Sequence, residues 1–217
     1  MEKTDLDTIA PVTPQALATV DTVAALWLAR AAPVRFSIAS SAAEREATYR
    51  LRYRAIVERG WKQPEELPGG IERDEWDDSA LHVAAWDGEV AVGSFRLIFP
   101  EPGRPLPVEA AFGVVIAPAG QAVELGRITV AREASETQHH IFMGLLGSSW
   151  QHIRMRGYVY LTSDMNAAML RLYGSLGLRL IRQGPPRPYW GERRFPGLCD
   201  IPGSAATLAR KWLGDSD

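Results

Sequence analysis

An acidic run at residues 71–78 contains the side chains of this chain that most clearly suit the binding of a charged group. Its carboxylates Asp74 and Asp77 lie close enough in sequence to receive a cationic amino group together. Trp61, from the preceding segment, could add an apolar wall beside them. The alternative is a solvated acidic loop that keeps the protein soluble or pairs with neighbouring arginines.

A second pair of candidates lies in the apolar segment 122–130, where Glu124 and Arg127 are three positions apart. Glu124, partly desolvated on a strand, could accept a proton from an amine directly or through a water. Arg127 and Arg96 could orient Glu124 or clamp a substrate carboxylate, because a guanidinium fork matches a carboxylate with two hydrogen bonds. The alternative is a structural ion pair between Glu124 and Arg127, and both interpretations can hold together.

The periodicity of apolar residues predicts a mixed α/β domain that would position these side chains. Helices are predicted over 14–28, 42–59, 135–155 and 166–176, and strands over 33–39, 82–86, 90–98, 122–130, 158–162 and 178–181. The clearest feature is a β-hairpin in which Asp87-Gly88 joins two of these strands. Residues 60–79 and 100–120 are rich in glycine and proline, so both are predicted to be irregular connections.

The late segment 165–178, with Asn166, Tyr173 and Gly177, resembles the corresponding helix of the GNAT acyltransferases. The motifs that sharpen this resemblance are Tyr49-Arg50-Leu51-Arg52, Gly60-Trp61, Glu72-x-Asp74-x-x-Asp77, Gly93-Ser94-x-Arg96-Leu97 and Glu124-Leu125-Gly126-Arg127. In this order they resemble the acyl-homoserine lactone synthases and, more closely, the long-chain N-acyl amino acid synthases. The resemblance covers residues 35–202 and implies a GNAT-like α/β (α+β) fold with a mixed central sheet flanked by helices.

The remaining segments are an N-terminal extension, residues 1–34, with an amphipathic helix, and a C-terminal helical tail, residues 203–217. Catalytic roles are implied for Glu124, Arg127 and Tyr173, the last of which matches a position that often returns a proton to a departing thiolate. Tyr173 could equally be an aromatic anchor between helix and sheet. The candidates for substrate binding are Arg52, Trp61, Glu72, Asp74, Asp77, Arg96 and Phe112.

The acyl donor is expected to be a carrier protein. GNAT enzymes that use coenzyme A normally place a glycine-rich turn around its pyrophosphate, whereas residues 130–136 contain no glycine. This favours the acyl-phosphopantetheine of acyl carrier protein as donor, with no other cofactor bound. The half of the chain from 127 to 217 carries 12 Lys and Arg against 7 Asp and Glu, and Arg132, Arg154 and Arg156 would suit an acidic carrier protein.

The acceptor is expected to be an amino acid. Lactone synthases usually carry a phenylalanine where this chain has Ile56, and residues 106–109 and 184–196 look more like the N-acyl amino acid synthases. The resemblance therefore implies an N-acyltransferase that moves a long-chain acyl group from acyl carrier protein to the amine of an amino acid. The alternatives are a lactone synthase that uses S-adenosylmethionine and a non-catalytic GNAT-like module that binds an acyl chain or a protein.

Composition bounds the remaining possibilities. The chain has 217 residues, enough for one sizeable α/β core, and a formal net charge of −2, which gives no reason to expect nucleic acid binding. The single cysteine, Cys199, rules out an intramolecular disulfide and suits a reducing compartment. No signal peptide or membrane-spanning run is evident, so a cytoplasmic protein is expected, with no metal site and at most a weak peripheral membrane contact through the helix at 14–28.

Overall fold

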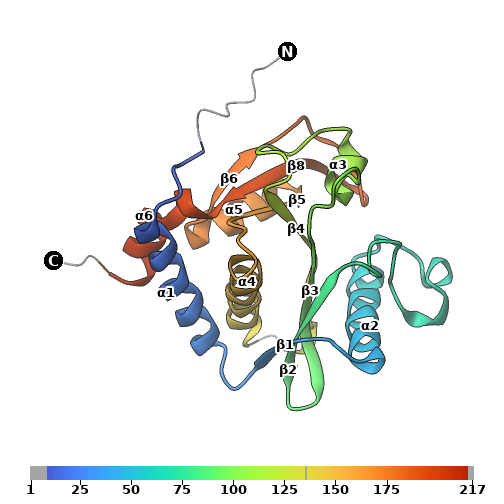
Figure 1. Ribbon diagram of the computed structural model, residues 1–217. Coiled ribbons are helices and arrows are strands. Elements are labelled where there is room, and N and C mark those ends of the chain that lie inside the picture. The colour runs from blue at the N-terminus through green and yellow to red at the C-terminus, as the bar shows by residue number, and fades with distance from the viewer. Residues whose placement is uncertain (1–8, 135, 215–217) are drawn as a thin grey trace. The chain divides into compact units, whose positions relative to one another are not determined.

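The computed structural model describes residues 9–134 and 136–214 (Figure 1). Residues 1–8 of the predicted N-terminal extension, residue 135 of the helix predicted over 135–155, and residues 215–217 of the predicted C-terminal tail lie outside the described residues. The helices are α1 Pro14–Arg30, α2 Ala42–Glu58, α3 Pro107–Phe112, α4 Gln138–Arg154, α5 Ala167–Leu176 and α6 Ile201–Trp212. The strands are β1 Arg35–Ile38, β2 Leu81–Asp87, β3 Val90–Ile98, β4 Ala122–Val130, β5 Tyr160–Met165, β6 Arg179–Arg182, β7 Arg187–Tyr189 and β8 Glu192–Asp200.

The chain forms two compact units, each built from segments that are distant in sequence. Unit 1 comprises residues 1–23, 99–124 and 150–217, and unit 2 comprises 24–98 and 125–149. Strand β4 contributes its first three residues to unit 1 and the rest to unit 2. None of the helices in the described residues is both long enough and apolar enough to span a membrane.

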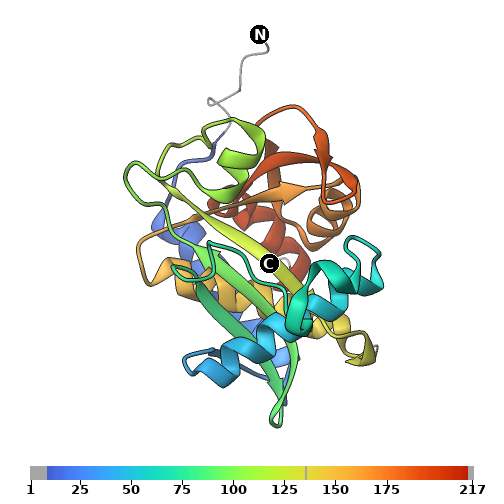
Figure 2. The same ribbon diagram turned by 90° about the vertical axis from the view of Figure 1, so that its right-hand side faces the viewer.

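Unit 2 contains the predicted hairpin. Strands β1, β2 and β3 are antiparallel neighbours, and β3 is followed by β4. Figures 1 and 2 show β2 and β3 as one long hairpin in green, with α2 in blue to cyan beside it. On the face opposite α2, a Cβ at Gly93 would lie 3.1 Å from the side chains of Ile141 and Leu145. Glycine at this position therefore lets α4 pack closely on β3.

In unit 1, the first three residues of β4 pair with β5. Residues Ala122, Val123 and Glu124 pair in parallel with Tyr160, Leu161 and Thr162 of β5. Strand β5 is antiparallel to β8, which also pairs with β6 and with the short strand β7. Helix α5 begins where the side chain of Asn166 accepts a hydrogen bond from Met169 N, and it ends at Gly177 in the left-handed conformation.

The predicted mixed sheet flanked by helices is confirmed, and three predicted details are wrong. The irregular connection at 100–120 contains α3, and the strand predicted at 158–162 lies at Tyr160–Met165. The third detail concerns the residues after 182, where no strand was predicted. They contain β7 and β8, and Pro196 lies inside β8. Proline normally argues against a central strand since it has no N–H to donate. The carbonyl oxygen of Pro196 still takes part in the pairing, because it accepts a hydrogen bond from Gln183 N, directly after β6.

Candidate active site

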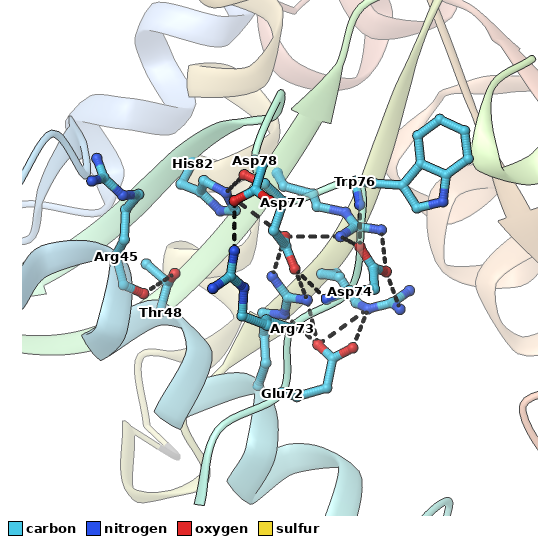
Figure 3. Close-up of polar contacts among 12 residues, drawn as sticks. Arg45, Thr48, Glu72, Arg73, Asp74, Trp76, Asp77, Asp78 and His82 are labelled. Carbon is cyan, nitrogen blue, oxygen red and sulfur yellow. Dashed lines mark hydrogen bonds and ion pairs between the residues drawn. The ribbon is translucent and has the colours of Figure 1, made fainter. Parts of the chain in front are cut away.

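Three arginines and three carboxylates form a closed ring of ion pairs in unit 2. The members are Arg52 from α2, Arg96 from β3, Arg127 from β4, and Glu72, Asp74 and Asp77 from the loop that precedes β2. Each arginine contacts two of the carboxylates, and each carboxylate contacts two of the arginines. We call this cluster the arginine–carboxylate ring. In Figure 3 the carboxylates of Glu72, Asp74 and Asp77 point toward one another, whereas the indole of Trp76 points away.

Helix α2 supplies the buried end of the ring. Its first turn is closed by a capping box in which Ser41 and Glu44 satisfy each other's backbone N–H groups. The N-cap fixes the residue at which α2 begins, and Arg52 lies on the buried face of this helix. The Arg52 guanidinium donates to both oxygens of Asp77, at 2.7 Å to Oδ1 and 3.0 Å to Oδ2, and also to Glu72.

Strands β3 and β4 supply the other two arginines. Arg96 donates to both oxygens of Asp74, at 2.5 and 2.8 Å, and to Asp77 Oδ1 at 2.8 Å. Arg127 donates to Glu72 Oε1 at 3.1 Å and to Asp74 Oδ2 at 2.9 Å. Bidentate pairs of this kind combine charge with a fixed orientation, so the ring defines the positions of all its side chains.

The loop folds so that its own backbone supports the ring. Asp77 Oδ2 accepts a hydrogen bond from Asp74 N at 2.8 Å, and Asp74 Oδ1 accepts one from Trp76 N at 3.0 Å. The loop is tied to α2 because Glu72 N donates to Tyr49 O at 3.1 Å. Short side chains that bond the local backbone favour turns over helices and strands, which explains why this acidic segment is irregular.

Burial is graded across the ring. The side chains of Arg52 and Asp77 are 2% and 0% exposed, whereas those of Arg127 and Asp74 are 18% and 28% exposed. The ring therefore has a closed end at Arg52 and Asp77 and an open end at Arg127 and Asp74. A ligand can reach the second pair without dismantling the first.

The arginines of the ring keep Asp74 and Asp77 ionised. Burial alone would raise the pKa of Asp74, but hydrogen bonds from Arg96 and the charges of Arg96 and Arg127 hold it below the ordinary value. Burial would likewise raise the pKa of Asp77, which Arg52 and Arg96 hold well below its usual range. Both carboxylates are thus anions at neutral pH.

His82 lies beneath the ring on β2. Its Nε2 is 3.0 Å from the carbonyl oxygen of Asp77, and its ring packs edge-on against Tyr49 at 5.3 Å between centroids. Burial lowers the pKa of His82, although the contact with Asp77 opposes this. A neutral imidazole that donates from Nε2 fits this position.

Arg127 has a backbone conformation that is unusual for its residue type. Its φ is +55°, in the left-handed region that bulky residues rarely occupy. A strained residue of this kind persists only where the surroundings impose it, and such residues cluster at functional sites. Arg127 is also one of the two residues at the open end of the ring.

The remaining catalytic candidates lie in unit 1. Glu124 is buried, and its Oε2 accepts a hydrogen bond of 2.8 Å from Val108 N in the first turn of α3. Tyr173 is buried on α5, where burial, followed by the nearby groups of Cys199 and Asp164, raises its pKa. Tyr173 therefore stays a neutral phenol at any ordinary pH. Phe112 is buried at the end of α3 with its ring 5.5 Å from that of Tyr189.

The other predicted residues occupy more open positions. Trp61 is half-buried with the guanidinium of Arg59 5.1 Å from its ring. Arg132 is exposed in unit 2, in the turn Arg132–Ala134. Arg156 is exposed in unit 1, and Arg154 is half-buried with its Nε 3.9 Å from Asp21. The expected role of these three arginines in carrier binding stays a prediction.

Glu109 is a structural residue of the site that the sequence interpretation missed. Its carboxylate accepts hydrogen bonds from Leu106 N and Ile116 N, both at 2.8 Å. Glutamate three residues after the N-cap of a helix is a recognisable capping signal, so α3 could have been predicted from this position. A hollow of about 270 Å³ is lined by the same segment, including Leu106, Glu109, Ile116 and Ala122.

Comparisons with known proteins identify a family and several similar folds. The model of the family described as N-acyl amino acid synthase FeeM matches residues 47–196. No curated protein matches the sequence. The structure of FeeM, an N-acyl amino acid synthase from uncultured soil microbes, is 16% identical, with a TM-score of 0.65 over 83% of this chain and 98% of that one.

Two further solved structures have similar folds. TofI, solved in a ternary complex with an inhibitor and MTA, is 23% identical, with a TM-score of 0.63 over 81% of this chain and 95% of that one. BjaI, described as a CoA-dependent acyl-homoserine lactone synthase and solved with SAM and isopentyl-CoA, is 24% identical, with a TM-score of 0.61 over 79% and 82%. At these identities the solved structures establish the shared fold.

Proposed function

We propose, because the chain belongs to the family of the N-acyl amino acid synthase FeeM, that it transfers an acyl group from acyl carrier protein to the amine of an amino acid. Membership of this family makes the chain an acyltransferase and sets aside the alternative of a non-catalytic module. The matched residues 47–196 include every candidate from Arg52 to Tyr173. The donor and the acceptor are the parts of the proposal that need their own support.

The open end of the arginine–carboxylate ring is the observation that carries the proposed acceptor. An amino acid brings both an amino group and a carboxylate, and the partly exposed Asp74 and Arg127 offer one group of opposite charge to each. The left-handed backbone of Arg127 is consistent with a side chain that is held for a ligand. Trp61 and Phe112 would contribute apolar surface to the two substrates.

The proposed reaction forms a C–N bond and breaks a C–S bond. The amine nitrogen, unprotonated so that its lone pair is available, attacks the thioester carbonyl of the donor. Glu124 accepts the proton that the nitrogen loses, directly or through a water. The phenol of Tyr173, which its raised pKa keeps protonated, donates a proton to the departing thiolate. The products are an N-acyl amino acid and a free thiol.

The proposed donor is the acyl-phosphopantetheine of acyl carrier protein. Support comes from the absence of glycine between residues 130 and 136, where a coenzyme A pyrophosphate would need a close backbone approach. The basic side chains Arg132, Arg154 and Arg156 would meet the acidic carrier. The reaction would then take place in the cytoplasm, where the lone Cys199 stays reduced.

Purified protein incubated with long-chain acyl carrier protein and a panel of amino acids tests the proposal by mass spectrometry of the products. We expect an N-acyl amino acid with at least one acceptor, and the same donor presented as acyl-CoA should react more slowly. Glu124→Gln should lower turnover by about 10²–10⁴-fold while the protein stays folded. Absence of any amide with either donor would refute the proposal.

Lactone synthesis from S-adenosylmethionine is the second candidate. BjaI, whose structure contains SAM, and TofI, whose structure contains MTA, are 24% and 23% identical to this chain, against 16% for FeeM. S-adenosylmethionine also carries an amino acid group, so Asp74 and Arg127 would suit it as well. Release of methylthioadenosine in the same reaction mixture would favour this candidate, and amide formation without it would favour the first.

A further inference from the structure

The side chain of Glu109 links the two ends of the segment that contains α3. Glu109 accepts a hydrogen bond from Leu106 N with Oε2 and from Ile116 N with Oε1, both at 2.8 Å. These two backbone groups stand at the beginning of α3 and beyond its end. The C-terminal turn is completed by Gly113, whose φ of +63° permits its N–H to donate to Glu109 O at 2.8 Å. A single residue therefore fixes both ends of the segment.

The first turn of α3 presents a backbone donor to Glu124. Proline occupies position 107 and has no N–H, so Val108 is the first residue of the helix that can donate. Its N–H lies 2.8 Å from Glu124 Oε2. Val108 and Glu124 are 2% and 5% exposed, so the bond is shielded from water.

We propose that Glu109 is a positioning residue for Glu124 and acts through the N–H of Val108. The proposal rests on the proposed function, in which Glu124 accepts the proton of the attacking amine. A glutamate side chain turns about three bonds, and one short hydrogen bond to Oε2 selects a single orientation of the carboxylate. Glu109 keeps that donor in place by holding α3 at both ends.

The chemistry of this task explains why a carboxylate is needed at position 109. Two N–H donors face the two oxygens of Glu109, and a carboxylate can accept at both. Glutamine has the same shape but only one acceptor oxygen, and its NH₂ group would face the second N–H. One end of the α3 segment would then shift, and a displacement of about 1 Å at a catalytic group can cost up to about 10²-fold in rate.

Steady-state kinetics of Glu109→Gln test the proposal. We expect kcat for the amino acid to fall roughly tenfold while KM for both substrates stays within twofold. Hydroxylamine is a small nucleophile that is largely unprotonated at neutral pH, so acyl transfer to it needs less help from Glu124. That side reaction should be retained in Glu109→Gln. Glu101→Gln removes the same charge from an exposed position in the same segment and should behave as wild type.

A double-mutant cycle separates positioning from general damage. If Glu109 acts through Glu124, single-turnover rates of Glu109→Gln/Glu124→Gln should equal those of Glu124→Gln alone. Equal losses with the amino acid and with hydroxylamine, or full additivity in the cycle, would overturn the proposal. If Glu109→Gln does not fold, Glu109→Asp, which keeps the charge but is too short to reach both N–H groups, takes its place with the same criteria.

The outcomes distinguish this inference from the proposed function itself. Wild-type turnover in Glu124→Gln would refute Glu124 as the proton acceptor and with it the basis of the inference. Loss of turnover in Glu124→Gln combined with wild-type kcat in Glu109→Gln would refute the inference alone. In that case the proposed acyl transfer would stand.

Discussion

Arg52 and Asp77 come from different elements and face each other through two parallel hydrogen bonds in a site that excludes water. The helix carries the arginine, the loop carries the carboxylate, and both side chains are at most 2% exposed. Buried charges are stable only while both partners are present, since each alone would remain desolvated and unpaired. The closed end of the arginine–carboxylate ring is therefore a condition of folding as well as part of the proposed acceptor site.

Replacing Arg52 should destabilise the protein severely. Arg52→Met leaves Glu72 and Asp77 buried with one partner fewer, so the free energy of unfolding should fall by about 3–5 kcal/mol in urea titrations. Arg50→Met is the matched control, because Arg50 is exposed and pairs with Glu46 one helical turn away. Its effect should stay below about 0.5 kcal/mol, and a similar loss in both variants would contradict the assignment.

The two ends of the ring should respond differently to neutralisation. Asp74→Asn changes the open end, so KM for the amino acid should rise roughly tenfold, the effect of losing about 1.4 kcal/mol of binding. Asp77→Asn removes an anion between two buried arginines and should cost about 3–5 kcal/mol of stability. Kinetics and urea unfolding of both variants check this division. It fails if the variants lose stability equally and leave KM unchanged.

Stability should depend on pH in two stages. Burial lowers the native-state pKa of His82, so the unfolded chain binds more protons below about pH 6.5 and the free energy of unfolding declines there. Asp74 and Asp77, whose pKa values are lowered, contribute stability that is present above about pH 4 and is lost as pH falls through their native values.

Urea unfolding between pH 8 and pH 3 measures both stages, and His82→Gln should remove only the first. His140→Gln is the control, since His140 is exposed on α4. A first stage that persists in His82→Gln would assign the effect to another group.

Two glycines in helices should respond to alanine with opposite sign. A Cβ at Gly147 of α4 would lie 2.8 Å from the carbonyl oxygen of Ala24, so Gly147→Ala should cost about 1–3 kcal/mol through crowding. A Cβ at Gly174 of α5 meets no atom within 4 Å. Gly174→Ala should therefore stabilise the protein by about 0.5–1 kcal/mol through helix propensity. Thermal unfolding of the two variants compares them directly.

Local signals in the sequence were sufficient for most helices and strands. The alternation in 82–86 and 90–98 and the turn at Asp87-Gly88 predicted the β2–β3 hairpin, and Asn166 and Gly177 marked the ends of α5. Strand β8 was missed because Pro196 and Gly197 weigh against a strand locally. Its place between β5 and β6 depends on pairing with distant segments, which a local pattern does not contain.

The members of the site could also be predicted, but their partners could not. Charge type and the family motifs singled out all six residues of the ring. Pairing of the acidic loop with arginines was among the interpretations of the sequence, but Arg127 was expected to serve Glu124 or a substrate, and it binds Glu72 and Asp74 instead. Which carboxylate each arginine meets depends on how β3, β4 and α2 are packed together. Glu109 was not singled out because the segment 100–120 was predicted to be an irregular connection, although its position three residues after the N-cap of α3 is a capping signal.

The arginine–carboxylate ring has equal numbers of positive and negative members, and each member neutralises two others. A single change of charge within it leaves two neighbours with an excess, which is most costly where those neighbours are buried. Libraries that vary one position at a time should find the buried positions Arg52, Glu72, Asp77 and Arg96 intolerant of change. Libraries that vary one acid together with one of its arginines should recover folded proteins, so viable routes of sequence change at this site pass through coupled pairs.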